Sequence, residues 1–146
     1  AIEPGPEAIP REDLAASGLL QSTSYRARRA CEIEAFDDWG PHYLLELEDL
    51  SILLLSGQFL CDYDPIDYDI EHDQPRRFPC TEFVVHQHRS EGYVIEIDCR
   101  GDVIEPTLVL DHQALEPIRE ALGCSPAAYE EVTHQAGTSF DALTQL

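Results

Sequence analysis

Two histidines and one glutamate form the most ligand-like pattern in the sequence. His86 and His88 stand two positions apart within residues 78–88, and Glu96 stands within residues 93–99. Side chains alternate along a β-strand, so both histidines would share one face. With Glu96 across the ladder, this face could hold a divalent ion completed by water, and zinc suits such ligands. The alternative is an exposed polar strand face that binds nothing.

An acidic segment offers a second set of side chains, suited to a partner. It follows Cys61 and resembles a calcium loop only in its alternating carboxylates, because Ile66 stands where an EF-hand needs an oxygen ligand. We expect a solvated surface loop whose two tyrosines could contact a protein. The predicted contact residues are Asp62, Tyr63, Asp64, Asp67, Tyr68, Asp69, Glu71 and Asp73.

Acidic residues dominate the charge of the chain. The sequence has 29 acidic residues and 9 basic residues, all arginine, for a formal net charge of -20. Phosphate contacts need a basic surface, so direct binding of nucleic acid or of an anionic membrane surface is disfavoured. The acidity fits a solvated surface, a basic protein partner or mimicry of a nucleic acid. The absence of lysine excludes Schiff-base and P-loop lysine chemistry.

The five cysteines do not form a recognisable framework. Their number is odd, their spacing is wide and no Cys-x-x-Cys pair occurs. We therefore expect neither a disulfide scaffold nor a thiolate zinc site, but reduced and mostly buried thiols. This pattern suits a reducing compartment, so we expect a cytoplasmic or cytoplasmic-facing chain. No apolar run approaches 18 residues, so insertion into a membrane is not expected.

No catalytic motif stands out. The sequence lacks a Gly-x-Ser-x-Gly elbow, a His-Glu-x-x-His pair, a phosphate loop and a Rossmann fingerprint. Cys80 or Cys99 could pair with His86 in a Cys-His enzyme, but nothing selects a nucleophile. The sequence therefore favours a protein that is not an enzyme and predicts no cofactor, with zinc at the histidine face as the alternative.

A hairpin must position the histidine face. Its turn lies near Gly92, which would supply a positive φ in a loop of odd length. The inward residues are predicted to be Phe83, Val85, Ile95 and Ile97. The opposite face then carries Glu82, Val84, His86, His88, Glu96 and Asp98.

A second hairpin, over residues 43–60, is the most apolar part of the chain and is predicted to be central. Period-two alternation places Tyr43, Leu45 and Leu47 on one face. A turn centred on residues 49–50 would set Leu47 opposite Ile52, or a four-residue loop would keep the same register. This register also sets Leu45 opposite Leu54. The second face is partly apolar, so both faces need cover.

The other elements follow from local patterns. Residues 1–10 are rich in proline and predict an extended arm or linker, followed by a short helix over residues 11–21. Alternation predicts a strand over residues 31–36, and the turn over residues 101–106 with the apolar run over residues 107–110 predicts one or two edge strands. Helices are predicted from Pro117 to Gly123, over residues 125–134, and from a Thr138 or Ser139 cap to Leu143.

These elements predict one α+β domain over residues 11–146, β-rich over 31–110 and helical over 111–146. Its sheet is mainly antiparallel and could curl into a small β-barrel, with short helices at the C-terminus. An exposed edge would favour a weak, salt-promoted homodimer.

Part of the chain resembles uncharacterised bacterial domains. Residues 42–100 contain Leu-Ser-Gly-Gln-Phe-Leu and, later, Phe-Pro-Cys-Thr-Glu-Phe. They are similar to domains whose hairpin carries an Asp-Gly turn followed by Leu-Ser-Gly-Gln, and they depart from that pattern at Leu50. The resemblance implies no activity. It implies that the domain could be an extramembrane part of a larger protein.

The sequence thus favours a non-enzymatic protein-interaction module with an acidic contact surface. A metal-binding protein or metal-dependent hydrolase that uses His86, His88 and Glu96 is one alternative. An acidic mimic of a nucleic acid is the other.

Overall fold

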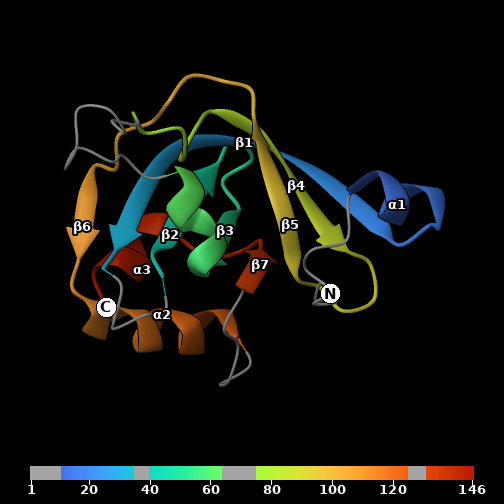
Figure 1. The fold of residues 1–146 in the computed structure, drawn as a ribbon. Helices are drawn as coiled ribbons and strands as arrows, with labels where there is room; N and C mark the ends of the chain where they lie inside the picture. Colours follow the sequence, from blue (N-terminus) through green and yellow to red (C-terminus); the bar gives the residue numbers. More distant parts are fainter. Residues whose placement is uncertain (1–10, 35–39, 64–74, 125–130) are drawn as a thin grey trace.

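The structure, a computed structural model, describes residues 11–34, 40–63, 75–124 and 131–146. It is an α+β fold around a mostly antiparallel sheet, curled into half a barrel (Figure 1). This confirms the predicted fold class. In chain order the elements are α1 (Arg11–Ala16), β1 (Leu20–Ile33), β2 (His42–Leu47), β3 (Ile52–Ser56), η2 (Gln58–Tyr63), β4 (Glu82–His88), β5 (Val94–Cys99), β6 (Leu108–Leu110), η4 (His112–Ala114), α2 (Leu115–Leu122), β7 (Glu131–Gln135) and α3 (Phe140–Thr144).

The long strand β1 joins the two halves of the sheet. Residues 20–26 pair with β4, and residues 27–33 pair with β2 after a register shift between Ala27 and Arg29. A bulge of this kind bends a strand and increases its twist. The sheet order is therefore β5-β4-β1-β2-β3-β7, with β6 parallel to the end of β1.

The first strand is predicted to begin at Cys31, but β1 begins at Leu20, eleven residues earlier. The predicted helix to Gln21 is wrong beyond Ala16, where α1 ends. The first half of β1 is rich in serine and arginine, and only Tyr25 and Ala27 are buried there. Two apolar residues at period two are only a weak signal for a strand in the local sequence. The extended conformation of this segment therefore depends on its pairing with β4 and β2.

Both strands of the central hairpin, β2 and β3, are buried at every residue. On one face, Leu45 and Leu53 pack in a core that includes Phe78. On the other face, Leu44 and Leu54 pack in a second core completed by α2 and α3. The prediction that both faces need cover is confirmed.

The predicted register of the central hairpin is wrong by one residue. Leu45 pairs with Leu53 and not with Leu54. The loop has three residues, because the Leu47 N–H donates to the Ser51 carbonyl at 2.9 Å, and its last residue, Leu50, has a φ of 69°. Three-residue hairpin loops end in a left-handed residue that is usually glycine, and here that residue is a leucine. A register slip of one residue matters because it exchanges the two faces of a strand.

The outer hairpin β4–β5 is confirmed, with one correction to its inward face. Phe83, Val85 and Ile97 are buried in the core as predicted, but Val94 and not Ile95 is the fourth residue there. The cause is a bulge: His86 pairs with Glu96 while the next residue of β4 pairs with Val94. Ile95 is the extra residue of the bulge and is only half-buried.

The C-terminal region holds two helices and one strand. α2 ends before Gly123, which has a φ of 72°, and Ser139 caps α3 by accepting from the Ala142 N–H at 3.2 Å, as predicted. The helix predicted over residues 125–134 is wrong for residues 131–135, which form β7 against β3. A strand there satisfies the backbone edge of β3.

The described residues contain no helix that is long and apolar enough to cross a membrane. The predicted N-terminal arm, residues 1–10, lies outside the described residues.

Candidate functional site

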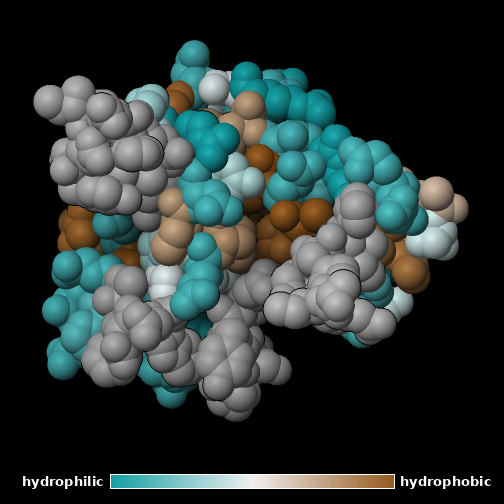
Figure 2. Space-filling view, in the orientation of Figure 1, coloured by the Kyte–Doolittle hydropathy of each residue, from teal (hydrophilic) through white to brown (hydrophobic). Residues whose placement is uncertain are grey.

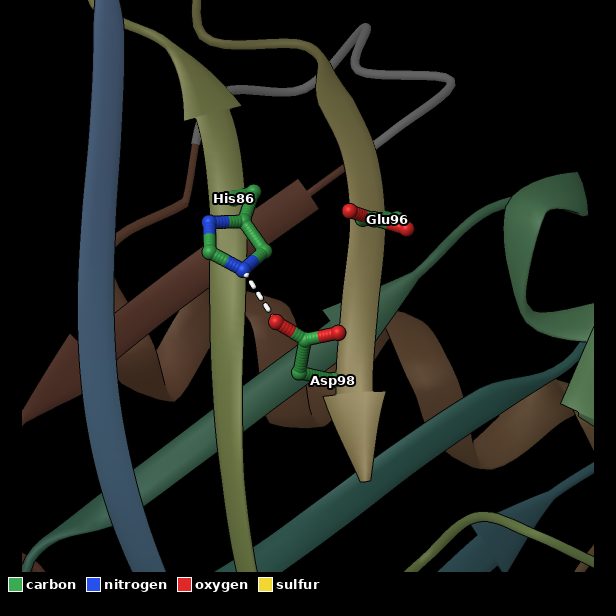
Figure 3. Close-up of side chains that lie close together, drawn as sticks. All are labelled: His86, Glu96 and Asp98. Atoms are coloured by element: carbon green, nitrogen blue, oxygen red, sulfur yellow. Dashed lines mark hydrogen bonds and ion pairs between the residues drawn. The ribbon is translucent and has the colours of Figure 1, made fainter. Parts of the chain in front are cut away.

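His86, Glu96 and Asp98 form a cluster on two neighbouring strands. His86 of β4 is the direct partner of Glu96 of β5, and Asp98 follows two positions along the same strand. The His86 Nε2 and Asp98 Oδ2 atoms are 2.7 Å apart, and one ligand atom from each of the three residues lies within 4.8 Å of the others. Figure 3 shows the imidazole and both carboxyl groups over the same stretch of the sheet.

Ser22 fixes the orientation of the imidazole from the other side. Its Oγ lies 2.7 Å from the His86 Nδ1 atom, and the two residues are direct partners in the β1–β4 ladder. Hydrogen bonding to His86 lowers the pKa of Asp98, so this carboxylate is ionised and can only accept. In the neutral ring, Nε2 therefore donates to Asp98 and Nδ1 accepts from the Ser22 hydroxyl.

A positive charge lies within the cluster. The Arg11 Nη1 atom of α1 is 3.3 Å from His86 Nε2 and 3.2 Å from Asp98 Oδ2, and it forms an ion pair with Glu96 Oε1. Leu14 anchors the short helix, since only 2% of it is exposed. With 7% of His86 exposed, the predicted open strand face is wrong at this position. The face is covered because the strand β1 and the helix α1 both pack beside it.

The structure keeps His88 apart from this cluster. Its Nδ1 atom accepts from the backbone N–H groups of Ser90 and Glu91 at 3.2 and 3.0 Å, and its ring lies 5.1 Å from that of Tyr93. The ring thus serves the turn between β4 and β5. Of the three predicted metal ligands, the structure brings together His86 and Glu96, and Asp98 is the third group beside them.

Only two residues of the predicted acidic contact segment are described. Asp62 is exposed, but Tyr63 is 9% exposed and its Oη accepts from the Ile97 N–H at 2.8 Å. Tyr63 is therefore a mostly buried residue that offers little surface to a partner, and its role in partner contact stays a prediction. The other predicted contact residues lie outside the described residues: Asp64, Asp67, Tyr68, Asp69, Glu71 and Asp73.

A groove runs beside β5. Its volume is about 890 Å³, and its lining includes Glu96 and Asp98 on one side and Asp62 of η2 on the other. The two carboxylates of the cluster are thus open to solvent, with side chains 40% and 35% exposed. An ion or a cationic side chain can reach them without unfolding the sheet.

All nine basic residues lie in the described parts of the chain, and each contacts an acceptor of the same chain. Two examples are buried or partly buried: Arg119 binds Glu131 at 2.9 Å, and Arg29 binds Glu46 at 2.9 Å. Carboxylates also face Arg11, Arg26, Arg28, Arg76 and Arg100. Arg77 and Arg89 donate to backbone carbonyls.

Sequence reasoning places Asp98 on the correct face but omits it from the ligand set. Its position two residues after Glu96 is the signal that would have included it. Ser22 and Arg11 are missed altogether. Each contacts His86 in space but is separated from it by more than sixty residues in the sequence. No local pattern carries that information.

Comparisons with protein-family models, with curated proteins and with solved structures find no match to this chain.

Proposed function

We propose that the chain is a non-enzymatic interaction module that binds a basic protein partner through its acidic surface. Two facts together support this proposal. Every arginine contacts an acceptor of the same chain, and the chain still has a formal net charge of -20. Seven arginines pair with carboxylates of the same chain and two donate to backbone carbonyls, which leaves a large surplus of carboxylates. A surplus of one sign attracts partners of the other sign and repels nucleic acid.

Exposed carboxylates without an ion pair occur on several elements of the described chain. They precede β3, follow β5 and lie on α1 and α2, and Figure 2 shows hydrophilic side chains over much of the visible described surface. A basic partner would gain contacts there without breaking an internal pair. Among the described residues these carboxylates include those of Glu12, Asp13, Glu48, Asp102 and Glu120.

The segment that begins at Asp62 remains the proposed centre of the contact surface. Asp62 is exposed beside the groove along β5, where Glu96 and Asp98 add two further carboxylates. Three acidic groups on the two walls of one groove suit an arginine-rich segment better than an acidic one.

Fluorescence anisotropy with an arginine-serine repeat peptide tests the proposal. We expect binding at an ionic strength of about 0.05 M and a large loss of affinity at about 0.5 M, because the Debye length shortens with salt. A glutamate-serine peptide and an unrelated protein of similar negative charge serve as controls. Binding no tighter than that of the unrelated protein would refute a specific module.

Neutralising variants then locate the surface. Asp62→Asn should weaken binding more than Glu12→Gln, because Asp62 lies in the groove and Glu12 lies on α1. If the two variants weakened peptide binding equally, the contact surface would not be centred at Asp62. A natural partner that duplex DNA displaces competitively would instead identify the chain as a nucleic-acid mimic.

A further inference from the structure

We propose that His86, Glu96 and Asp98 bind one divalent transition-metal ion, and that Arg11 is the internal cation which the metal replaces. Three ligand atoms from three side chains lie within 4.8 Å of one another. A guanidinium nitrogen lies among them, in contact with all three residues. The cluster thus already selects a positive charge.

The charges favour a divalent ion over the guanidinium. Glu96 and Asp98 supply two negative charges, and Arg11 neutralises one of them within the cluster. Arg100 lies farther away, with its Nη2 atom 3.9 Å from Asp98 Oδ2 and its side chain 59% exposed. An ion with two charges would neutralise both carboxylates at the point where they converge.

The donor set indicates the class of metal. One imidazole and two carboxylates suit zinc, manganese or iron, whereas calcium takes six to eight oxygen ligands. Bonds of about 2.0–2.2 Å to a zinc ion require ligand atoms about 3.4 Å apart in a tetrahedron. The ligand atoms lie within 4.8 Å of one another, and the His86 Nε2–Asp98 Oδ2 pair, at 2.7 Å, would open to admit the ion. Water would complete the coordination.

Ser22 supplies the support that a metal-bound histidine requires. When Nε2 binds the metal, the ring proton must reside on Nδ1, and the Ser22 Oγ atom at 2.7 Å can accept it. The same hydroxyl donates to Nδ1 in the metal-free ring. The ring therefore exchanges tautomers without losing its hydrogen bond to Ser22. Metal-ligating histidines commonly donate their other ring N–H to a partner of this kind.

Arg11 can leave the cluster at small cost. Its side chain is 37% exposed and belongs to a helix of only six residues. Exposed ion pairs contribute little to stability, so removing the guanidinium should raise zinc affinity by about fivefold while the fold is retained.

Isothermal titration with Zn²⁺ alone, on protein without a histidine tag, tests the proposal. We expect one site in the wild-type chain, tighter binding in Arg11→Gln, and a loss of about tenfold or more in His86→Ala and Asp98→Asn. The spectrum of bound Co²⁺ should change in the same variants. Mg²⁺ should not compete.

Two histidine variants are matched controls. His88→Ala removes a ring that serves the turn, and His112→Ala removes an exposed histidine whose Nδ1 atom lies 3.4 Å from Asp111. Both should bind Zn²⁺ as the wild type does.

Near-ultraviolet circular dichroism shows whether each variant is folded. Absence of zinc binding in folded Arg11→Gln would overturn the proposal. Binding that survives His86→Ala, or that disappears in His88→Ala, would overturn it equally.

Discussion

The two hairpins of the sheet each contain a histidine paired with a serine across a strand ladder. In the central hairpin, His42 Nδ1 lies 2.8 Å from Ser56 Oγ, and in the outer sheet, His86 Nδ1 lies 2.7 Å from Ser22 Oγ. Both histidines are buried, at 4% and 7% exposure. The surroundings of the two rings differ. His86 Nε2 lies 2.7 Å from Asp98 Oδ2 with Glu96 beside it, whereas the carboxylate that acts on His42 belongs to Glu131, which is paired with Arg119 at 2.9 Å.

This difference separates a structural histidine, His42, from the proposed metal ligand, His86. Burial, followed by the charge of Arg119, lowers the pKa of His42 to about 4, so its ring stays neutral. Around His86 the negative charges attract a cation, which in this structure is Arg11. The same pair of residue types thus stabilises a core in one hairpin and, in our proposal, orients a metal ligand in the other.

The largest expected effect compares one glutamate from each hairpin. Glu46 is 7% exposed and binds Arg29 through two hydrogen bonds, of 2.9 and 3.1 Å. Glu46→Gln should reduce the free energy of unfolding by about 3 kcal/mol, because a buried carboxylate loses two charge-assisted hydrogen bonds to Arg29. Glu96→Gln should cost less than about 1 kcal/mol, because its pair with Arg11 is partly exposed. Urea denaturation of both variants measures the difference, and equal losses would remove the contrast between the hairpins.

The second effect is the acid sensitivity that His42 confers. Its pKa is near 6.5 in the unfolded chain and about 4 in the folded chain, so the unfolded state binds the proton first as pH falls. This contribution is complete above pH 6.5 and is lost towards pH 4, by roughly 3 kcal/mol in total.

His42→Asn keeps an acceptor for Ser56 and removes the titration. The stability of this variant should fall less between pH 6.5 and 4 than that of the wild type, as measured by urea denaturation at each pH. Parallel pH profiles for the two proteins would show that His42 does not titrate as a buried neutral base.

Alternation predicts both hairpins and the faces of their residues, but it does not fix their details. The one-residue error in the central hairpin arises at Leu50, whose left-handed backbone no leucine preference would indicate. The bulge at Ile95 is equally silent in the sequence, because an isoleucine there fits the alternation better than Val94 does. β1 and β7 depend on pairing with strands distant in sequence, and local propensity does not report such pairing.

A smaller effect tests the loop of the central hairpin. Leu50 has a φ of 69° and is 56% exposed, so it bears backbone strain without contributing to the core. Leu50→Gly should raise the free energy of unfolding by about 1 kcal/mol. A destabilised variant would contradict the three-residue loop and restore the predicted two-residue turn.

The smallest effect concerns self-association at β6. Leu108 and Val109 are 40% and 57% exposed, and Figure 2 shows apolar side chains at the edge of the molecule where β6 lies. We expect weak dimerisation that increases with salt, since the net charge opposes contact. Val109→Lys should abolish it in sedimentation velocity runs. A monomer at every salt concentration in the wild type would refute this edge contact.

The candidate site is predictable only in part. Period two brings His86 and Glu96 to one face, and the ladder confirms that they are partners. The same rule groups His88 with them, but the turn recruits that ring through two backbone N–H groups. Ser22 and Arg11 enter through tertiary packing, so the charge balance of the site could not be foreseen.

The contrast between the two histidines can be measured in one experiment. Nuclear magnetic resonance of ¹⁵N-labelled imidazole rings, recorded as equimolar Zn²⁺ is added, reports the tautomer and ligation of each histidine. The account predicts that His86 Nε2 shifts to a metal-bound position with the proton on Nδ1, while the resonances of His42 stay in place. Unchanged His86 resonances under saturating zinc, or equal shifts of the two rings, would contradict it.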